Sequence, residues 1–122
     1  MITLFFDTYA FYEIIVGNPN YAVYIKDIKI VTTQLNLMDL YYHLLLIYPK
    51  QDALELFNRY HEFIVPISNQ VIIEAMDFRC TNRRKRLSYV DCIGYTISNK
   101  QGIKFLTGDK QFENMPNVEY VK

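Results

Sequence analysis

The chain has 122 residues, of which 51% are hydrophobic and 21% charged, and its 13 basic side chains balance its 13 acidic ones. This length predicts a single domain over residues 1–122, and the composition is that of a soluble globular protein. Zero net charge excludes a global field that would attract nucleic acid or a membrane, so any such attraction must come from local patches.

The first half of the chain alternates apolar runs with segments of helical periodicity. The apolar run "TLFF" predicts a buried strand that a polar residue ends. The segment "DIKIVTT" has the β-branched character of a second strand, and Pro49 stops the long periodic segment that follows it. We therefore expect strands at 3–6 and 27–33 and helices at 9–16, 34–48 and 51–63.

The second half contains clearer signals for the ends of its elements. Ser68 and Ser88 are suited to cap helices over 69–86 and 89–101, and Gly102 ends the second of these. The segment "IVPIS" indicates a third strand or its exit, and "IKFLT" and "VEYV" indicate two more. Strands separated by helices predict a three-layer α/β/α sandwich around a mainly parallel sheet of about five strands.

Other features of the chain exclude some classes of protein. The aliphatic stretch "LYYHLLLIY" is shorter than the roughly 20 residues that a membrane span needs. Cys80 and Cys92 have neither the spacing of a zinc site nor that of a disulfide framework, which favours reduced thiols. We expect a soluble, cytoplasmic protein without a signal peptide or a membrane span.

Two aspartates follow apolar strands directly, and two more lie near the starts of helices. Asp7 and Asp109 come after the first and fourth predicted strands, while Asp39 and Asp91 lie in early helical turns. Functional groups in open parallel sheets gather beyond the carboxyl ends of the strands, so these acids can meet in one pocket. Four carboxylates repel one another unless protons or a cation neutralise them, and oxygen ligands suit Mg²⁺ or Mn²⁺. The pattern predicts a metal-assisted phosphodiester hydrolase, although Asp7 and Asp39 also suit simple roles at helix starts.

Basic and aromatic side chains allow two interpretations each. The segment "RCTNRRKR" places Arg83, Arg84 and Arg86 before the helix of Asp91, either as ordinary charge at a helix end or as an RNA-binding patch. Most of the 11 tyrosines and 8 phenylalanines are expected in the core, with Tyr41 and Tyr42 as candidates for base stacking. The two histidines, residues 43 and 61, are expected to be packing or surface residues.

Three stretches together resemble one protein family. They are "FFDTYAFYEII", "LNLMDLYYHLL" and "LSYVDCIGYTISNKQGIKFLTGDKQF", and they are similar to PIN domains of the VapC-like toxin branch. The resemblance implies that Asp7, Asp91 and Asp109 are acidic metal ligands. Asp39 stands where the family usually has glutamate, which is one methylene longer. The hydroxyls of Thr8 and Thr107 match positions expected to hydrogen bond near the ligands.

The resemblance also implies an activity and partners. It implies an endoribonuclease that depends on Mg²⁺ or Mn²⁺, takes RNA as its substrate, and is the toxin of a VapBC-type toxin–antitoxin pair. A homodimer and an antitoxin protein are the expected partners. The alternative is a catalytically weak or inactive PIN-like module that binds RNA or protein. A receiver domain and a haloacid-type phosphatase are disfavoured, because Thr8 and Tyr9 follow Asp7 where those proteins need a second acid.

Overall fold

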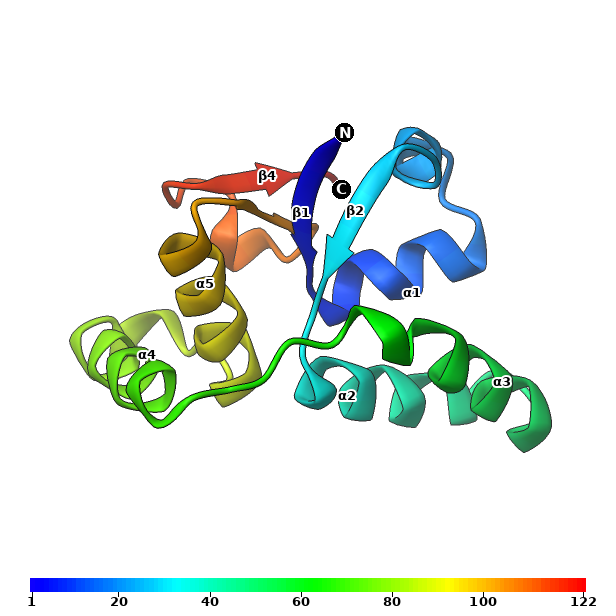
Figure 1. Cartoon of the computed structure of the whole chain (residues 1–122), viewed down its shortest axis with the longest axis horizontal. Helices are drawn as coiled ribbons and strands as arrows, with labels where there is room; N and C mark the ends of the chain where they lie inside the picture. Colours follow the sequence, from blue (N-terminus) through cyan, green and yellow to red (C-terminus); the bar gives the residue numbers. More distant parts are fainter.

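A parallel sheet of four strands forms the middle of the molecule (Figure 1). The structure is a computed structural model that describes all residues 1–122. The strands are β1 (Ile2–Phe6), β2 (Ile28–Val31), β3 (Lys104–Thr107) and β4 (Val118–Tyr120). Their order across the sheet is β2-β1-β3-β4, and each neighbouring pair runs parallel.

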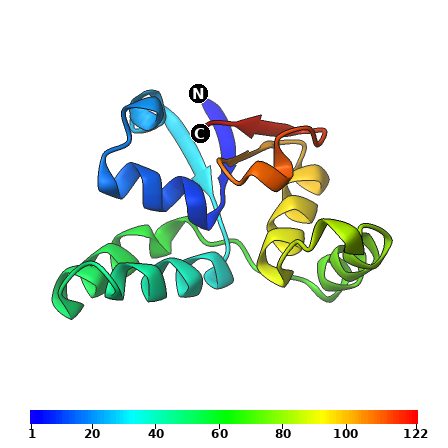
Figure 2. The same cartoon turned by 180° about the vertical axis from the view of Figure 1, so that it is seen from behind.

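Helices cover both faces of this sheet (Figures 1 and 2). One group consists of α1 (Thr8–Val16), α2 (Gln34–Leu45) and α3 (Lys50–Tyr60), and the other of α4 (Asn69–Thr81) and α5 (Tyr89–Gln101). Short 3₁₀ turns complete the chain: η1 (Pro19–Tyr24), η2 (His61–Phe63), η3 (Arg83–Lys85) and η4 (Lys110–Phe112). The predicted three-layer α/β/α sandwich is therefore confirmed. No helix is long and apolar enough to cross a membrane.

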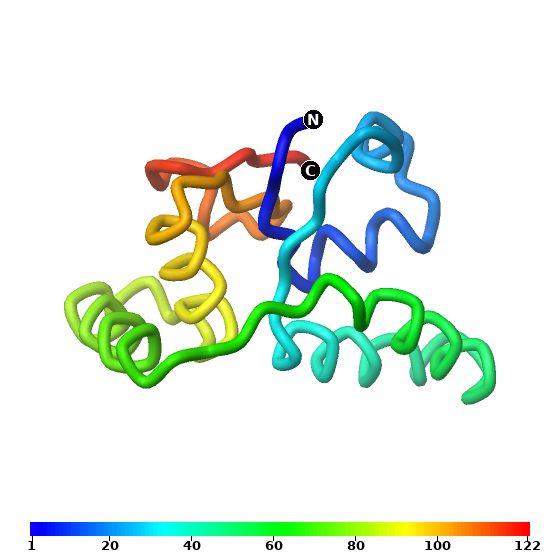
Figure 3. The backbone as a smooth tube through the Cα atoms, in the orientation of Figure 1, coloured from blue at the N-terminus to red at the C-terminus, as the bar shows by residue number.

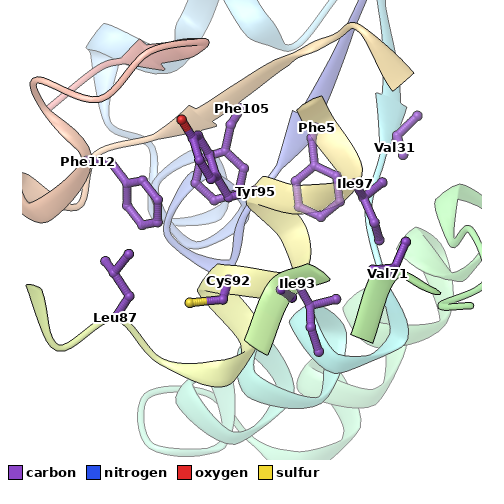
Figure 4. Packing of buried hydrophobic residues seen from close by; sticks show 11 residues of the cluster. Phe5, Val31, Val71, Leu87, Cys92, Ile93, Tyr95, Ile97, Phe105 and Phe112 are labelled. Atoms are coloured by element: carbon purple, nitrogen blue, oxygen red, sulfur yellow. The ribbon is translucent and has the colours of Figure 1, made fainter. Parts of the chain in front are cut away.

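Alternation along the strands divides the core into two clusters. In β1, Leu4 and Phe6 belong to the cluster under α1 and α2, whereas Phe5 belongs to the cluster under α4 and α5. Successive side chains of a strand point to opposite faces, so one apolar strand supplies both cores. On the α5 side the rings of Phe5 and Phe105 stack with centroids 5.5 Å apart (Figure 4).

Local capping signals set the starts of α4 and α5 and the end of α5 where the sequence predicted them. Ser68 and Ser88 each accept a hydrogen bond from a backbone N–H three residues on, which begins α4 and α5. Gly102 adopts a left-handed conformation with φ of 67° and ends α5 as expected. The predicted helix over 34–48 ends earlier, at Leu45, and the one predicted over 69–86 ends at Thr81, before η3.

The segment "IVPIS", expected as a third strand or the exit from one, forms no strand of the sheet. Ile64 makes only an isolated bridge to Thr32, through hydrogen bonds from the Thr32 N–H to the Phe63 carbonyl (3.0 Å) and from the Val65 N–H to the Thr32 carbonyl (2.9 Å). Pro66 follows immediately and has no N–H to extend the ladder. The segment instead carries the chain from the α2–α3 group across to α4 (Figure 3).

The strand order creates one position suited to a ligand site. The chain passes from β1 to β2 on one side and later returns to β3 on the other side of β1. In open α/β sheets the crevice beyond the carboxyl ends of the strands at this reversal is where ligands bind. Asp7 and Asp109 come directly after these two strand ends.

Candidate metal centre

A pocket of about 390 Å³ opens beyond the ends of β1 and β3. All four aspartates singled out in the sequence line it, although they come from four separate segments of the chain. Its lining residues are Asp7, Thr8, Tyr9, Tyr12, Glu13, Asp39, His43, Ser88, Asp91 and Asp109. The convergence predicted from strand ends and helix starts is thus present in the fold.

Asp7 is the most deeply placed of these acids, with 3% of its surface exposed. It caps α1, because its Oδ1 accepts a hydrogen bond of 2.8 Å from the Ala10 N–H. Burial is the main cause that raises the pKa of its carboxyl from 3.8 to about 8, and the negative charges of Asp91 and Asp109 contribute to the same shift. Hydrogen bonds from the Thr107 hydroxyl and the Ala10 N–H act in the opposite direction. The pocket therefore disfavours a charged Asp7 unless a positive charge is near.

Asp91 is held by a reciprocal pair of hydrogen bonds at the start of α5. Its Oδ2 accepts from the Ser88 N–H at 3.1 Å, and the Ser88 Oγ accepts from the Asp91 N–H at 3.0 Å. This capping box fixes the carboxylate at the pocket wall. Burial raises the pKa of Asp91, and the charges of Asp109 and Asp39 contribute to the same shift.

Asp109 starts η4 in a similar way, since its Oδ1 accepts a hydrogen bond of 3.0 Å from the Gln111 N–H. Its own N–H donates to Thr107 Oγ1 at 3.0 Å. Gly108, between them, is closely enclosed: a Cβ there would lie 2.1 Å from the Tyr9 ring. The buried hydroxyl of Thr107 thus hydrogen bonds the Asp7 carboxyl and the backbone N–H of Asp109.

Asp39 lies in the second turn of α2 and is more exposed than Asp7, with 41% of its side chain accessible. Its Oδ1 is 3.6 Å from the Nδ1 of His43, one turn further on, and the same nitrogen is 2.8 Å from the Asp39 carbonyl. Unlike the other three aspartates, Asp39 caps no helix start. Its carboxylate lines the pocket with His43 as its neighbour.

Thr8 contacts α2 and makes no hydrogen bond to an acid. Its hydroxyl donates to the Asn36 carbonyl at 3.3 Å and accepts from the Asn36 amide at 3.5 Å. Asn36 is buried and bonded in turn to Thr33, the cap of α2. Thr8 thus joins the start of α1 to the start of α2, which carries Asp39.

The three arginines predicted to bind RNA lie outside the pocket. Arg83 and Arg84 belong to η3, Arg86 follows it, and all three are exposed. Arg83 donates to the Cys80 carbonyl at 3.1 Å, and Arg86 has a left-handed backbone with φ of 55°. None of them lines the cavity. Their expected role in binding RNA stays a prediction for a surface beside the pocket.

Several lining residues were not predicted from the sequence. His43 was expected to be a packing or surface residue, and although it is exposed it also lines the pocket. Tyr9, Tyr12 and Glu13 reach the pocket from α1. Their spacing from the acids could have predicted these positions in the pocket. His43 is one helical turn beyond Asp39, and the α1 residues follow Asp7.

The four carboxylates suit a hard divalent cation in their chemistry. Asp7, Asp91 and Asp109 each use one oxygen for a helix-start hydrogen bond, which leaves the second oxygen outside that bond. Oxygen-only ligands are those preferred by Mg²⁺ and Mn²⁺. No three or more His, Cys, Asp or Glu side chains are, however, close enough together to hold one ion in this conformation. The acids interact electrostatically without forming a preassembled cage.

Comparisons with known proteins agree with this fold. The chain resembles the VapC20 toxin of Mycobacterium tuberculosis, described as cleaving the sarcin–ricin loop, with a TM-score of 0.80, 15% identity, and coverage of 98% of this chain and 99% of that one. It also resembles VapBC2 from Rickettsia felis, solved bound to promoter DNA, with a TM-score of 0.75, 16% identity and coverage of 99% and 100%. The chain also resembles a toxin–antitoxin complex from Klebsiella pneumoniae, with a TM-score of 0.74, 15% identity and coverage of 95% of each chain.

These structural likenesses, at such low identity, show a shared fold. No curated protein sequence matches the chain. The model of the PIN domain family matches residues 4–118, which include all four aspartates of the pocket. The chain therefore belongs to the PIN domain family.

Proposed function

We propose that this protein is an endoribonuclease that depends on Mg²⁺ or Mn²⁺ and hydrolyses RNA phosphodiester bonds. The observation that carries the proposal is the meeting of Asp7, Asp39, Asp91 and Asp109 in one pocket at the reversal of the sheet. Such a concentration of carboxylates, with a buried acid whose pKa is raised, is typical of a site built for a cation. A bound divalent ion would supply an activated water and neutralise charge on the phosphate.

The chain's own residues then have distinct roles. Asp7, Asp91 and Asp109 would hold the ion, and the Thr107 hydroxyl orients the two strand-end acids. Neither oxygen of the Asp39 carboxylate caps a helix, so Asp39 is our candidate for accepting the proton of the attacking water. The carboxylates would have to move closer together than they are here to share one ion.

The proposal includes partners as well. The VapBC complexes among the similar structures support an antitoxin partner that would silence the activity. We also propose that the protein works as a homodimer in the cytoplasm, and that Arg83, Arg84 and Arg86 grip the RNA backbone beside the pocket.

Incubation with single-stranded RNA and Mn²⁺ tests the activity. Wild type and the control Asp77→Asn, an exposed helix position, should cleave, whereas Asp7→Asn and Asp91→Asn should not. Cleavage that persists in both pocket variants would belong to a contaminant and would refute the proposal. A DNA oligonucleotide of the same sequence, run in parallel, tests the choice of RNA.

Two observations favour a second candidate, an inactive module that binds RNA or a protein partner. No three acids are arranged for a single ion, and Asp39 is a short side chain where the family usually has glutamate. Titration with Mn²⁺ separates the two candidates. Heat of binding that Asp7→Asn abolishes supports the nuclease, and no binding at all supports the inactive module.

A further inference from the structure

Two rings line the acidic pocket, and a third contacts one of them from outside the pocket. Tyr12 reaches it from α1, and His43 and Tyr42 come from α2. The centroids of Tyr12 and His43 are 6.5 Å apart, and those of Tyr42 and His43 are 5.6 Å apart. We call these three residues the ring cluster. Tyr12 and His43 also line the pocket itself, so the cluster is continuous with the acids.

The ring cluster is open rather than packed away. Tyr42 is 60% exposed, and 48% of the His43 side chain is accessible. Both contacts within the cluster are edge-to-face, with planes at 76° and 82°, so no two of its rings stack on each other. The Nδ1 of His43 is 2.8 Å from the Asp39 carbonyl, which holds the imidazole in place. A flat apolar ligand can therefore lie against an exposed ring face.

Tyr41, the residue before Tyr42 on α2, packs against another helix instead of being exposed. Tyr41 is half-buried and contacts Phe57 of α3 with centroids 5.6 Å apart, so its ring packs between helices. Of the two tyrosines that the sequence offered as base-stacking candidates, only Tyr42 presents a largely exposed ring. Contacts within the chain account for the position of Tyr41 and cover little of the Tyr42 ring.

The acids of the pocket repel phosphate, so RNA bound there needs a contribution to its affinity that does not depend on charge. Five acidic side chains line the cavity, Glu13 among them, and none of the three arginines considered for RNA binding does. A phosphate that approaches the ionised ones is repelled until a cation intervenes, so RNA gains little from the pocket itself. Stacking of a base on an aromatic ring is neutral and is worth about 1–3 kcal/mol. A base stacked on the ring cluster would lie beside the acids, because Tyr12 and His43 line the same pocket.

We propose that the ring cluster is a base-stacking subsite that binds an unpaired nucleobase of the RNA next to the phosphate that is cleaved. This inference rests on the proposed function and adds the substrate class to it. A base inside a duplex has both faces covered by its neighbours, whereas a base in a loop or single strand can turn out onto a ring. The protein should therefore select single-stranded segments over helical RNA.

The test measures RNA affinity without cleavage. Anisotropy of a labelled single-stranded RNA is recorded in EDTA for wild type, Tyr42→Phe and Tyr42→Leu. Phenylalanine keeps the aromatic face, while leucine keeps apolar bulk and loses it. We expect Tyr42→Leu to weaken binding about tenfold and Tyr42→Phe to bind like wild type. Because stacking is uncharged, the slope of affinity against salt should stay the same in both variants.

Changing the RNA gives the complementary control. An abasic oligonucleotide and a duplex should both bind wild type more weakly than the single strand, and Tyr42→Leu should cost nothing further on either. Equal affinity of Tyr42→Leu and wild type for the single strand would overturn the stacking proposal. Equal loss in Tyr42→Phe would also overturn it.

Cleavage assays in Mn²⁺ separate this inference from the proposed function. A wild type that cleaves RNA while Tyr42→Leu binds normally would refute only the stacking subsite. A wild type that never cleaves, but loses affinity in Tyr42→Leu, would refute the nuclease and leave the subsite as an RNA-binding site.

Discussion

Replacing Asp7 with asparagine should stabilise the protein at neutral pH when divalent cations are removed. Burial holds the pKa of Asp7 near 8, against 3.8 for an ordinary aspartate, so the folded carboxyl keeps its proton over a range in which the unfolded one has lost it. Between these two values the folded state binds more protons, and stability falls as pH rises. Asparagine cannot ionise and can still accept the Ala10 N–H bond that caps α1.

The size of this effect follows from the two pKa values. Stability linked to Asp7 is fully present below about pH 4 and is lost as pH approaches 8, at about 1.4 kcal/mol for each pH step. At pH 7 the loss is about 4 kcal/mol, and Asp7→Asn should recover it.

Urea unfolding in EDTA at pH 4 and pH 7 measures the difference directly. The variant and wild type should agree at pH 4 and diverge at pH 7, while Asp77→Asn should follow wild type at both. Mn²⁺ should stabilise wild type at pH 7 and leave Asp7→Asn nearly unchanged. Equal stabilities of wild type and Asp7→Asn at pH 7 would refute the argument that the pocket disfavours a charged Asp7.

Three further variants test separate parts of the structure. Ser88→Ala removes the capping box of α5 and should cost about 1 kcal/mol in urea unfolding, whereas Ser88→Thr should keep most of it; equal losses would contradict the capping role. Gly94→Ala would place a Cβ 2.7 Å from the Phe5 ring and should lower the unfolding free energy by about 1–3 kcal/mol, so an unchanged or higher Tm would show that the α5–sheet contact can relax. Charge reversal at Arg84 and Arg86 should weaken RNA binding and flatten its dependence on salt; unchanged affinity would remove these residues from the RNA surface.

Local signals made the last part of the chain predictable. The helix from Ser88 to Gly102 was predicted with its correct ends, because a serine cap and a left-handed glycine are encoded by single residues. The strand predicted at "IVPIS" failed for an equally local reason, since Pro66 cannot extend a ladder. Apolar character alone did not distinguish a strand from an extended crossing segment.

The sequence predicted which acidic residues come together, but it did not predict the distances between their oxygens. Asp7 and Asp109 follow neighbouring strands, so the topology of a parallel sheet brings them to one edge. Whether their oxygens reach one ion depends on side-chain conformation, which strand periodicity does not encode. The entry of His43 into the pocket depends on how α1 and α2 pack, a contact between segments about 30 residues apart.

Diffraction at the manganese absorption edge, from a crystal soaked in Mn²⁺, tests the central claim most directly. The account predicts an anomalous peak between Asp7, Asp91 and Asp109, with an oxygen of each carboxylate drawn within coordination distance. A pocket without such a peak, with the three carboxylates as far apart as they are here, would contradict it.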